Sequence, residues 1–186
     1  TAALDATGAV DRGTRQVTAG AGVTIGALQK HAAAAGLAYG VDLASRDSAT
    51  VGGTIATNAG GVRVVRHGAT REQVLGVEVV LADGTVVEHL AGLPKDSAGY
   101  DLSGLMVGSE GTLGVVTAAR LRLVDPLPAG RTTVLVGVAS TAAALGLLGQ
   151  SGLLAAELVV GAALDLVCRV TGLPVPLAHR WPVYVL

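Results

Sequence analysis

The 186-residue sequence predicts an α+β fold, a mixed or antiparallel sheet flanked by helices and followed by a smaller α+β unit. Three observations support this prediction. The valine-rich runs 74–81 and 85–90 flank Asp83-Gly84, a pair preferred in two-residue type I′ hairpin turns. Residues 125–128 contain two prolines, which break helix and strand alike and mark a domain boundary. Beyond them, residues 131–186 alternate between strand-like and helix-like runs.

The first elements along the chain are a strand over residues 15–19 and a helix over residues 25–35. Thr24 is a suitable N-cap for this helix, because its hydroxyl can accept a hydrogen bond from the first turn. Gly36 stands at the C-terminal end, where glycine is favoured. One face of the helix carries the apolar residues Ile25, Leu28, Ala32 and Ala35.

After the predicted hairpin, Asp101 is expected to cap a short helix that runs through Met106. A strand over residues 113–124 follows. In its second half two arginines alternate with two leucines over residues 120–123, so one face of the strand should be buried and the other exposed to water.

Beyond the two prolines, the pattern predicts a β-α-β-α-β order. The strands are expected over residues 131–139, 154–159 and 182–186, and the helices over residues 141–148 and 162–170. We therefore place the domain boundary between residues 127 and 128, which gives domains 1–127 and 128–186.

Composition excludes several classes of protein. Hydrophobic residues make up 51% of the chain, charged residues 15%, and the net charge is −1. This balance argues against disorder and against a partner such as nucleic acid, which would call for a basic excess. Cys168 is the only cysteine, so an internal disulfide is excluded, and a reducing cytoplasmic location is expected, with peripheral membrane attachment as an alternative.

The long apolar stretch 134–167 carries only two charges, but glycines and polar residues at 146–152 interrupt it. No run of about 20 apolar residues remains, so no transmembrane segment is predicted. The histidines, His31, His67, His89 and His179, are spaced unlike metal ligands, and the sequence predicts neither a metal site nor a catalytic residue within the chain.

The segment 42–61, DLASRDSATVGGTIATNAGG, is rich in small residues, hydroxyls and glycine. A backbone needs this composition where a large polar ligand lies directly against it, because glycines allow close approach and amide N–H groups then bind phosphate or ring oxygens. The segment 108–117, GSEGTLGVVT, repeats this chemistry in a strand setting. The alternative is that these glycines only form turns and bulges. A Rossmann fold is excluded, because no G-x-G-x-x-G pattern appears between a strand and a helix with an acidic residue downstream.

At these two segments the sequence resembles the flavin-binding fold of the vanillyl-alcohol oxidase / p-cresol methylhydroxylase family. It is most similar to the D-2-hydroxyglutarate and D-lactate dehydrogenase branch. The landmarks ATVGGTIATNAGG, VRHG, VLGVEVVLADGTVV and KDSAGYDLSGLMVGSEGTLGVVT occur in the family's order and spacing, and the resemblance covers most of the chain.

The resemblance implies non-covalent binding of FAD, since neither segment contains cysteine. In the first segment it assigns cofactor contacts to Asp42, Leu43, Ala44, Ser48, Ala49, Thr50, Gly52, Gly53, Thr57, Asn58, Ala59, Gly60 and Gly61. In the second segment it assigns them to Glu110, Gly111, Thr112, Gly114, Val115 and Val116. Residues 50–53 would offer consecutive amides to the diphosphate, with a helix beginning at Gly53, and Thr57 and Asn58 would bind ring or ribitol oxygens.

The implied activity is FAD-dependent oxidation of a D-2-hydroxy acid, such as D-2-hydroxyglutarate or D-lactate, with electrons passed to an unknown acceptor. The family's pattern includes an earlier Gly-rich loop and later histidines that bind substrate and zinc, which this sequence does not contain. We therefore expect an internal fragment, inactive by itself, with residues 1–127 as the second FAD subdomain and 128–186 as the start of a substrate cap. Two alternatives are a non-catalytic flavin-binding remnant and an alcohol or aldonolactone oxidase of the same fold.

A basic patch follows the first segment and contains Arg63, Arg66, His67 and Arg71. It is either a solvated loop or a set of cations near the flavin phosphates or an anionic substrate. The family carries an aromatic residue where this sequence has His67, which leaves both interpretations open.

Overall fold

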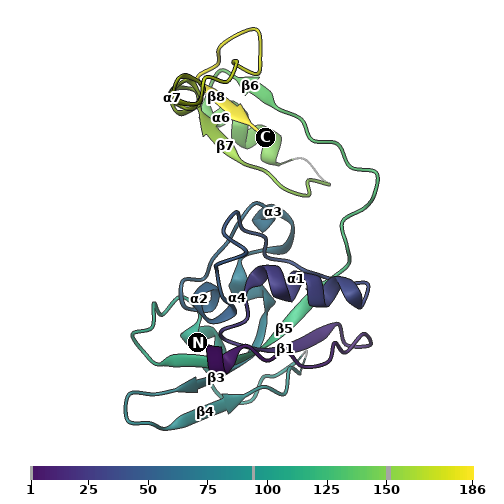
Figure 1. The fold of residues 1–186 in the computed structure, drawn as a ribbon, viewed down its shortest axis with the longest axis vertical. Coiled ribbons are helices and arrows are strands. Elements are labelled where there is room, and N and C mark those ends of the chain that lie inside the picture. The colour runs from purple at the N-terminus through teal and green to yellow at the C-terminus, as the bar shows by residue number, and fades with distance from the viewer. Residues whose placement is uncertain (1, 94, 150–151) are drawn as a thin grey trace. The chain divides into compact units, whose positions relative to one another are not determined.

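The computed structural model describes residues 2–93, 95–149 and 152–186 and has the predicted α+β class (Figure 1). It divides into two compact units, Thr1–Leu127 and Pro128–Leu186, which we describe separately.

The first unit is built on an antiparallel sheet with β5 (Val115–Val124) at its centre. β1 (Gln16–Gly20) pairs with one edge of β5, and β3 (Val74–Val80) pairs with the other. β4 (Val86–His89) extends the sheet beyond β3, and the two-residue β2 (Ala38–Tyr39) pairs with the end of β5. The long strand β5 therefore connects all the other strands of this unit.

The predicted alternation along β5 is confirmed. Leu121 and Leu123 are buried, whereas Arg122 is exposed. Arg120 is half-buried and donates hydrogen bonds to Gln16 Oε1 at 2.8 Å and Thr18 Oγ1 at 3.2 Å on β1. The polar face of the sheet is thus stabilised by cross-strand hydrogen bonds to a charged donor.

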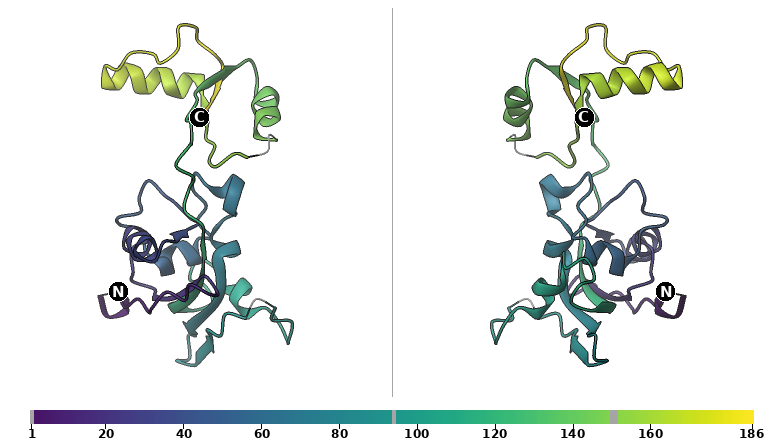
Figure 2. Two further views of the ribbon diagram at one scale, coloured as in Figure 1. Left: turned by 90° about the vertical axis from the view of Figure 1, so that its right-hand side faces the viewer. Right: turned by 90° about the vertical axis from the view of Figure 1, so that its left-hand side faces the viewer.

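The helix α1 (Ile25–Ala34) confirms the predicted cap, since Thr24 Oγ1 accepts from Ala27 N at 3.2 Å. Its apolar face is buried against the sheet at Ile25, Leu28 and Ala32, and Figure 2 shows the helix lying along one side of the strands. This packing forms the main core of the unit.

Five short helical segments accompany α1. The helix α5 (Leu102–Met106) was predicted, and Asp101 caps it by accepting from Gly104 N at 2.7 Å. The others are η1 (Ala2–Leu4), α2 (Val51–Ala56), α3 (Val64–His67) and α4 (Thr70–Gln73). Neither η1, α3 nor α4 was predicted, because three or four residues are too few to show helical periodicity.

The β3–β4 hairpin was predicted correctly, but its turn was not. Leu81 N donates to Thr85 O at 2.9 Å and Gly84 N to Leu81 O at 3.0 Å, so the loop has three residues, 82–84. A type I′ turn requires positive φ at both central residues, and here only Gly84 (φ +86°) has one. The connection is a type I turn followed by a left-handed glycine, which Asp83 supports by accepting from Thr85 N at 2.9 Å.

The second unit confirms the predicted β-α-β-α-β order. It contains β6 (Val136–Val138), α6 (Thr141–Leu148), β7 (Leu158–Val160), α7 (Gly161–Thr171) and β8 (Val183–Val185). Both outer strands pair antiparallel with β8, in the order β6-β8-β7. They are shorter than predicted, because β8 offers only three residues for pairing.

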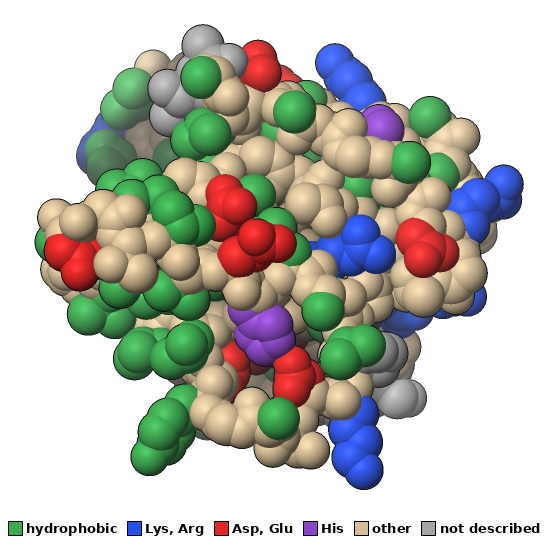
Figure 3. Space-filling model, turned by 90° about the horizontal axis from the view of Figure 1, so that it is seen from below, with side chains coloured by type: hydrophobic (Ala, Val, Ile, Leu, Met, Phe, Trp, Pro, Cys, Tyr) green, Lys and Arg blue, Asp and Glu red, His purple; other side chains and the backbone are tan. Residues whose placement is uncertain are grey.

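Surface charge is sparse over the described residues. On the face shown in Figure 3, Lys and Arg side chains are scattered among uncharged and acidic side chains. Among the helices of the described residues, none is both long and apolar enough to cross a membrane.

Candidate cofactor site

The helix α2 is held by its first residues. Thr50 is its N-cap and accepts from Gly53 N at 3.2 Å. The amides of Val51 and Gly52 donate to carbonyls of Val23 and Ala21 at 2.8 and 2.9 Å. The helix therefore begins at Val51, two residues before the predicted start, and the amides of residues 51–53 are bonded within the protein. They are not the consecutive free donors that the sequence suggested for a diphosphate.

Two adjacent glycines of α2 have different surroundings. A Cβ atom on Gly52 would lie 2.7 Å from Ala21 Cβ, so this glycine allows α2 to pack closely on the chain leaving β1. Gly53 is exposed, and the nearest atom to a Cβ there is Thr50 Oγ1 at 3.2 Å. Of the two, Gly53 is the one that leaves the outer surface of the helix open.

The two glycine-rich segments come together in the structure although about fifty residues separate them. Gly108 N donates to Ile55 O, and Glu110 N donates to Ala56 O, both at 2.9 Å. These carbonyls belong to the last turn of α2, and Ile55 O also accepts from Asn58 N at 3.1 Å. Segment 108–116 is thus hydrogen-bonded to the end of α2, and the two form one continuous ridge, which we call the α2 ridge.

Thr57 and Asn58 follow α2 on this ridge. Some of their hydrogen-bonding groups already have partners within the protein. The Thr57 hydroxyl donates to Gly53 O at 3.0 Å, so towards a ligand it can only accept. Asn58 adopts a left-handed conformation (φ +48°), and its Oδ1 accepts from Arg71 N at 2.9 Å. Its Nδ2 group donates to none of the residues that the structure describes, and it remains available to a ligand.

The second half of the ridge exposes backbone. Glu110 and Gly111 have positive φ (+53° and +74°), and nothing lies within 4 Å of a Cβ built on Gly111. Thr112 folds back on Ser109 O through both its amide and its hydroxyl. The amides of Gly111 and Leu113 have no acceptor among the described residues, and both residues are exposed. These N–H groups are the donors that the ridge presents to its surroundings.

Gly114 packs closely against β3, and its cofactor contact stays a prediction. A Cβ atom at this position would lie 2.6 Å from Val79 Cγ1 and 2.9 Å from Val80 O, so its lack of a side chain makes room for β3. Val115, directly after it, is 65% exposed and continues the open surface of the ridge.

Asp42, the first residue of segment 42–61, connects the beginning of this segment to its end. Its carboxylate forms ion pairs with Arg63 at 2.8 Å and with Arg46 at 3.1 Å, and Gly61 packs against its carbonyl oxygen. Asp42 therefore holds the two ends of the loop together. The other predicted residues of the loop follow the backbone around it: Leu43 and Ala49 pack on the core, Gly60 packs against Val64, and Ala44 and Ser48 are exposed.

The residues of the predicted basic patch do not form one cluster in the structure. Arg63 pairs with Asp42, and the guanidinium of Arg71 donates to the carbonyls of Gly104 and Val107 around α5. Arg71 is thus a connection between α4, α5 and Asn58, a role that the sequence did not indicate. Arg66 and His67 instead line a cavity together with residues of β5.

Comparison with known proteins shows what most of the first unit is similar to. Residues 2–89 match the family described as FAD binding domain. This segment is therefore similar to FAD-binding domains over just under half of the chain.

The curated relatives include D-2-hydroxyglutarate dehydrogenase of Xanthomonas citri pv. viticola, 50% identical over 65% of this chain and 26% of the relative. The mitochondrial D-2-hydroxyglutarate dehydrogenase of Bos taurus is 48% identical over 63% of this chain and 21% of its own length. Glycolate oxidase subunit GlcD of Bacillus subtilis is 50% identical over 54% of this chain and 21% of the relative. The chain thus spans about a quarter of the length of these relatives.

Among solved structures, alkyldihydroxyacetonephosphate synthase is similar over 66% of this chain and 22% of that protein. The TM-score is 0.58 and the sequence identity 25%, which supports the fold assigned to the first unit.

Proposed function

We propose that the protein is an FAD-dependent dehydrogenase that oxidises a D-2-hydroxy acid, such as D-2-hydroxyglutarate or D-lactate, to the 2-oxo acid. The observation that carries the proposal is the α2 ridge, in which two glycine-rich segments are joined by the Gly108 and Glu110 hydrogen bonds. The names of the relatives support the reaction class, because dehydrogenation of a 2-hydroxy acid is common to them.

The residues of the ridge fit a flat, polar cofactor. Gly53 and Gly111 leave space for close approach, and the Asn58 Nδ2 group and the amides of Gly111 and Leu113 can donate to its oxygens. When bound, FAD supplies the hydride acceptor. The residues of this chain bind and orient it, and exposed side chains such as Val115 shield it from water.

The proposal includes non-covalent attachment. Cys168 is the only cysteine, and it lies on α7 in the second unit, where Sγ contacts Pro174 O at 3.8 Å. Acid precipitation of the flavin-loaded protein is therefore expected to release all of the yellow colour into the supernatant. Flavin that stays with the denatured pellet after washing would contradict non-covalent binding.

The finer assignments also belong to the proposal: domain 1–127 binds FAD, domain 128–186 contributes to the substrate cap, and the location is cytoplasmic. The proposal also includes zinc in the full-length protein, bound by residues outside this chain as the family resemblance implies.

Turnover tests the reaction class directly. We expect the flavin-loaded protein, isolated at the length of its relatives, to reduce a dye with D-2-hydroxyglutarate, D-lactate or glycolate and not with the L-enantiomers of the chiral acids. Activity with simple alcohols or aldonolactones alone would instead favour an oxidase of this fold. Flavin binding without turnover on any of these substrates would favour a non-catalytic flavin-binding module.

A further inference from the structure

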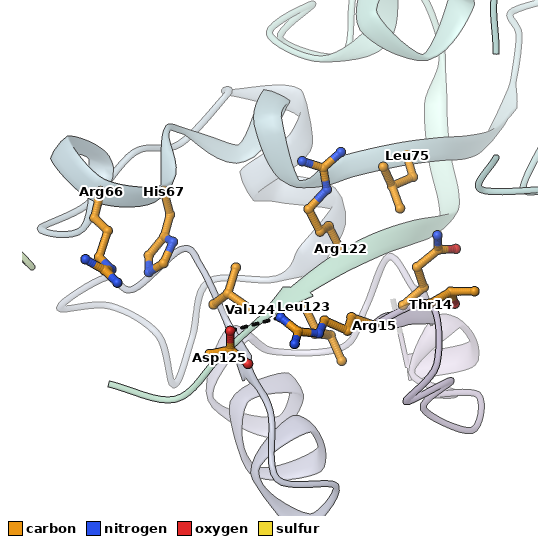
Figure 4. A pocket seen from close by; sticks show the side chains of 10 residues that line it. Thr14, Arg15, Arg66, His67, Leu75, Arg122, Leu123, Val124 and Asp125 are labelled. Carbon is orange, nitrogen blue, oxygen red and sulfur yellow. Dashed lines mark hydrogen bonds and ion pairs between the residues drawn. The ribbon is translucent and has the colours of Figure 1, made fainter. Parts of the chain in front are cut away.

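A cavity of about 460 Å³ lies in the first unit, between α3 and the end of β5 (Figure 4). This volume is in the range of small-molecule sites, about 300–1,000 Å³. Leu75, Leu123 and Val124 give it apolar walls. Its polar lining consists of Thr14, Arg15, Gln16, Arg66, His67, Arg122 and Asp125.

The side chains that line this cavity carry more positive than negative charge. Arg15 is neutralised, because its Nη1 lies 2.9 Å from Asp125 Oδ2. Among the residues that the structure describes, no carboxylate lies within ion-pair distance of Arg66 or Arg122. The cavity therefore contains two guanidinium groups in excess over its carboxylates.

Two elements, α3 and β5, contribute these groups to the lining of one cavity. Arg66 and His67 extend side by side from α3, and Arg122 extends from β5 between them and Leu75, as Figure 4 shows. The Gln16 side chain is already bonded, through Nε2 to Gly92 O and through Oε1 to Arg120 Nε. The unsatisfied donors of the cavity are thus cationic or imidazole N–H groups.

We propose that this cavity is a binding site for a small anion with carboxylate or phosphate oxygens, held by Arg66, His67 and Arg122. Guanidinium groups present paired N–H donors that match the two oxygens of a carboxylate or phosphate, and such charge-assisted hydrogen bonds are stronger than neutral ones. The apolar walls accommodate the carbon chain of an organic acid.

The lowered pKa of His67 supports the proposal of an anion in this cavity. Burial, followed by the charges of Arg66 and Arg63, lowers the pKa of His67 below its ordinary value. Arg15, Arg122 and Asp125 also line the cavity beside it. An anion bound among them would stabilise the imidazolium form, so we expect the pKa of His67 to rise on binding.

The test is an NMR titration of the imidazole resonances of His67 in the 186-residue chain without flavin. Succinate and inorganic phosphate are added separately, against sodium chloride at the same ionic strength. We expect a saturable shift with at least one of the two anions and a higher His67 pKa at saturation. The arm that saturates at lower concentration identifies the ligand as a dicarboxylate or a phosphate. Because no flavin is present, the result is independent of the proposed function.

Three variants complete the experiment. Arg66→Gln and Arg122→Gln, both at exposed positions, should each weaken binding by about tenfold while the amide spectrum stays that of a folded chain. Arg169→Gln, which removes the same charge from exposed α7, should bind like the unmodified chain. The inference is overturned if neither anion shifts His67 beyond the chloride control, or if all three variants bind equally well.

Discussion

Replacing Gly53 by valine is expected to weaken FAD binding by about tenfold or more while the first unit stays folded. The new side chain would stand on the outer surface of α2, where the cofactor is proposed to lie. Only Thr50 Oγ1, at 3.2 Å, needs to adjust within the protein. The measurement is the dissociation constant for FAD, followed by quenching of its fluorescence, together with the circular dichroism of the variant.

The matched control is the neighbouring glycine. Gly52→Val directs its side chain into Ala21, so it should destabilise the fold by about 1–3 kcal/mol through overpacking. FAD binding at a temperature where this variant is still folded should change less than for Gly53→Val. If Gly53→Val retains full affinity, the outer face of α2 is not part of the cofactor site.

Replacing Gly61 by alanine is expected to destabilise the first unit by about 3 kcal/mol. Gly61 has φ +104°, and its Cβ would lie 2.1 Å from the carbonyl oxygen of Asp42. The substitution therefore combines an unfavourable backbone conformation with a clash against backbone that closes the loop. The free energy of unfolding from urea denaturation measures the effect.

Gly84 provides the comparison for Gly61. It also has positive φ (+86°), but nothing lies within 4 Å of its Cβ position. Gly84→Ala should therefore lower the free energy of unfolding only through the unfavourable backbone conformation, by about 1–2 kcal/mol. Equal losses of stability in the two variants would show that the contact between Gly61 and Asp42 contributes nothing.

Much of the fold could be predicted from local sequence patterns. The cap at Thr24, the alternation of residues 120–123 and the hairpin are encoded by neighbouring residues, and all three are present. The hairpin turn type was missed because Asp83-Gly84 suits two kinds of turn, and pairing of Leu81 with Thr85 selects the longer one. The strands of the second unit were predicted too long because strand length depends on the partner β8, which is distant in sequence.

The candidate site was predicted as two segments, but not as the ridge that they form. The hydrogen bonds from Gly108 and Glu110 to the end of α2 are long-range contacts, which no local pattern reveals. For the same reason the sequence could not separate glycines that face open space, such as Gly111, from those that accommodate a neighbouring strand, such as Gly114. It also grouped Arg63, Arg66 and Arg71 together, although their partners differ.

The most direct test of the proposed cofactor site is an NMR titration of the chain with FAD, in which every backbone amide is followed. We predict that the largest shifts occur at the exposed residues Gly53, Gly111 and Leu113 of the α2 ridge and at the half-buried Asn58. The Gly53→Val variant should lose these shifts. Shifts confined to other parts of the chain, or no shift at millimolar FAD, would contradict the assignment of the α2 ridge as the cofactor site.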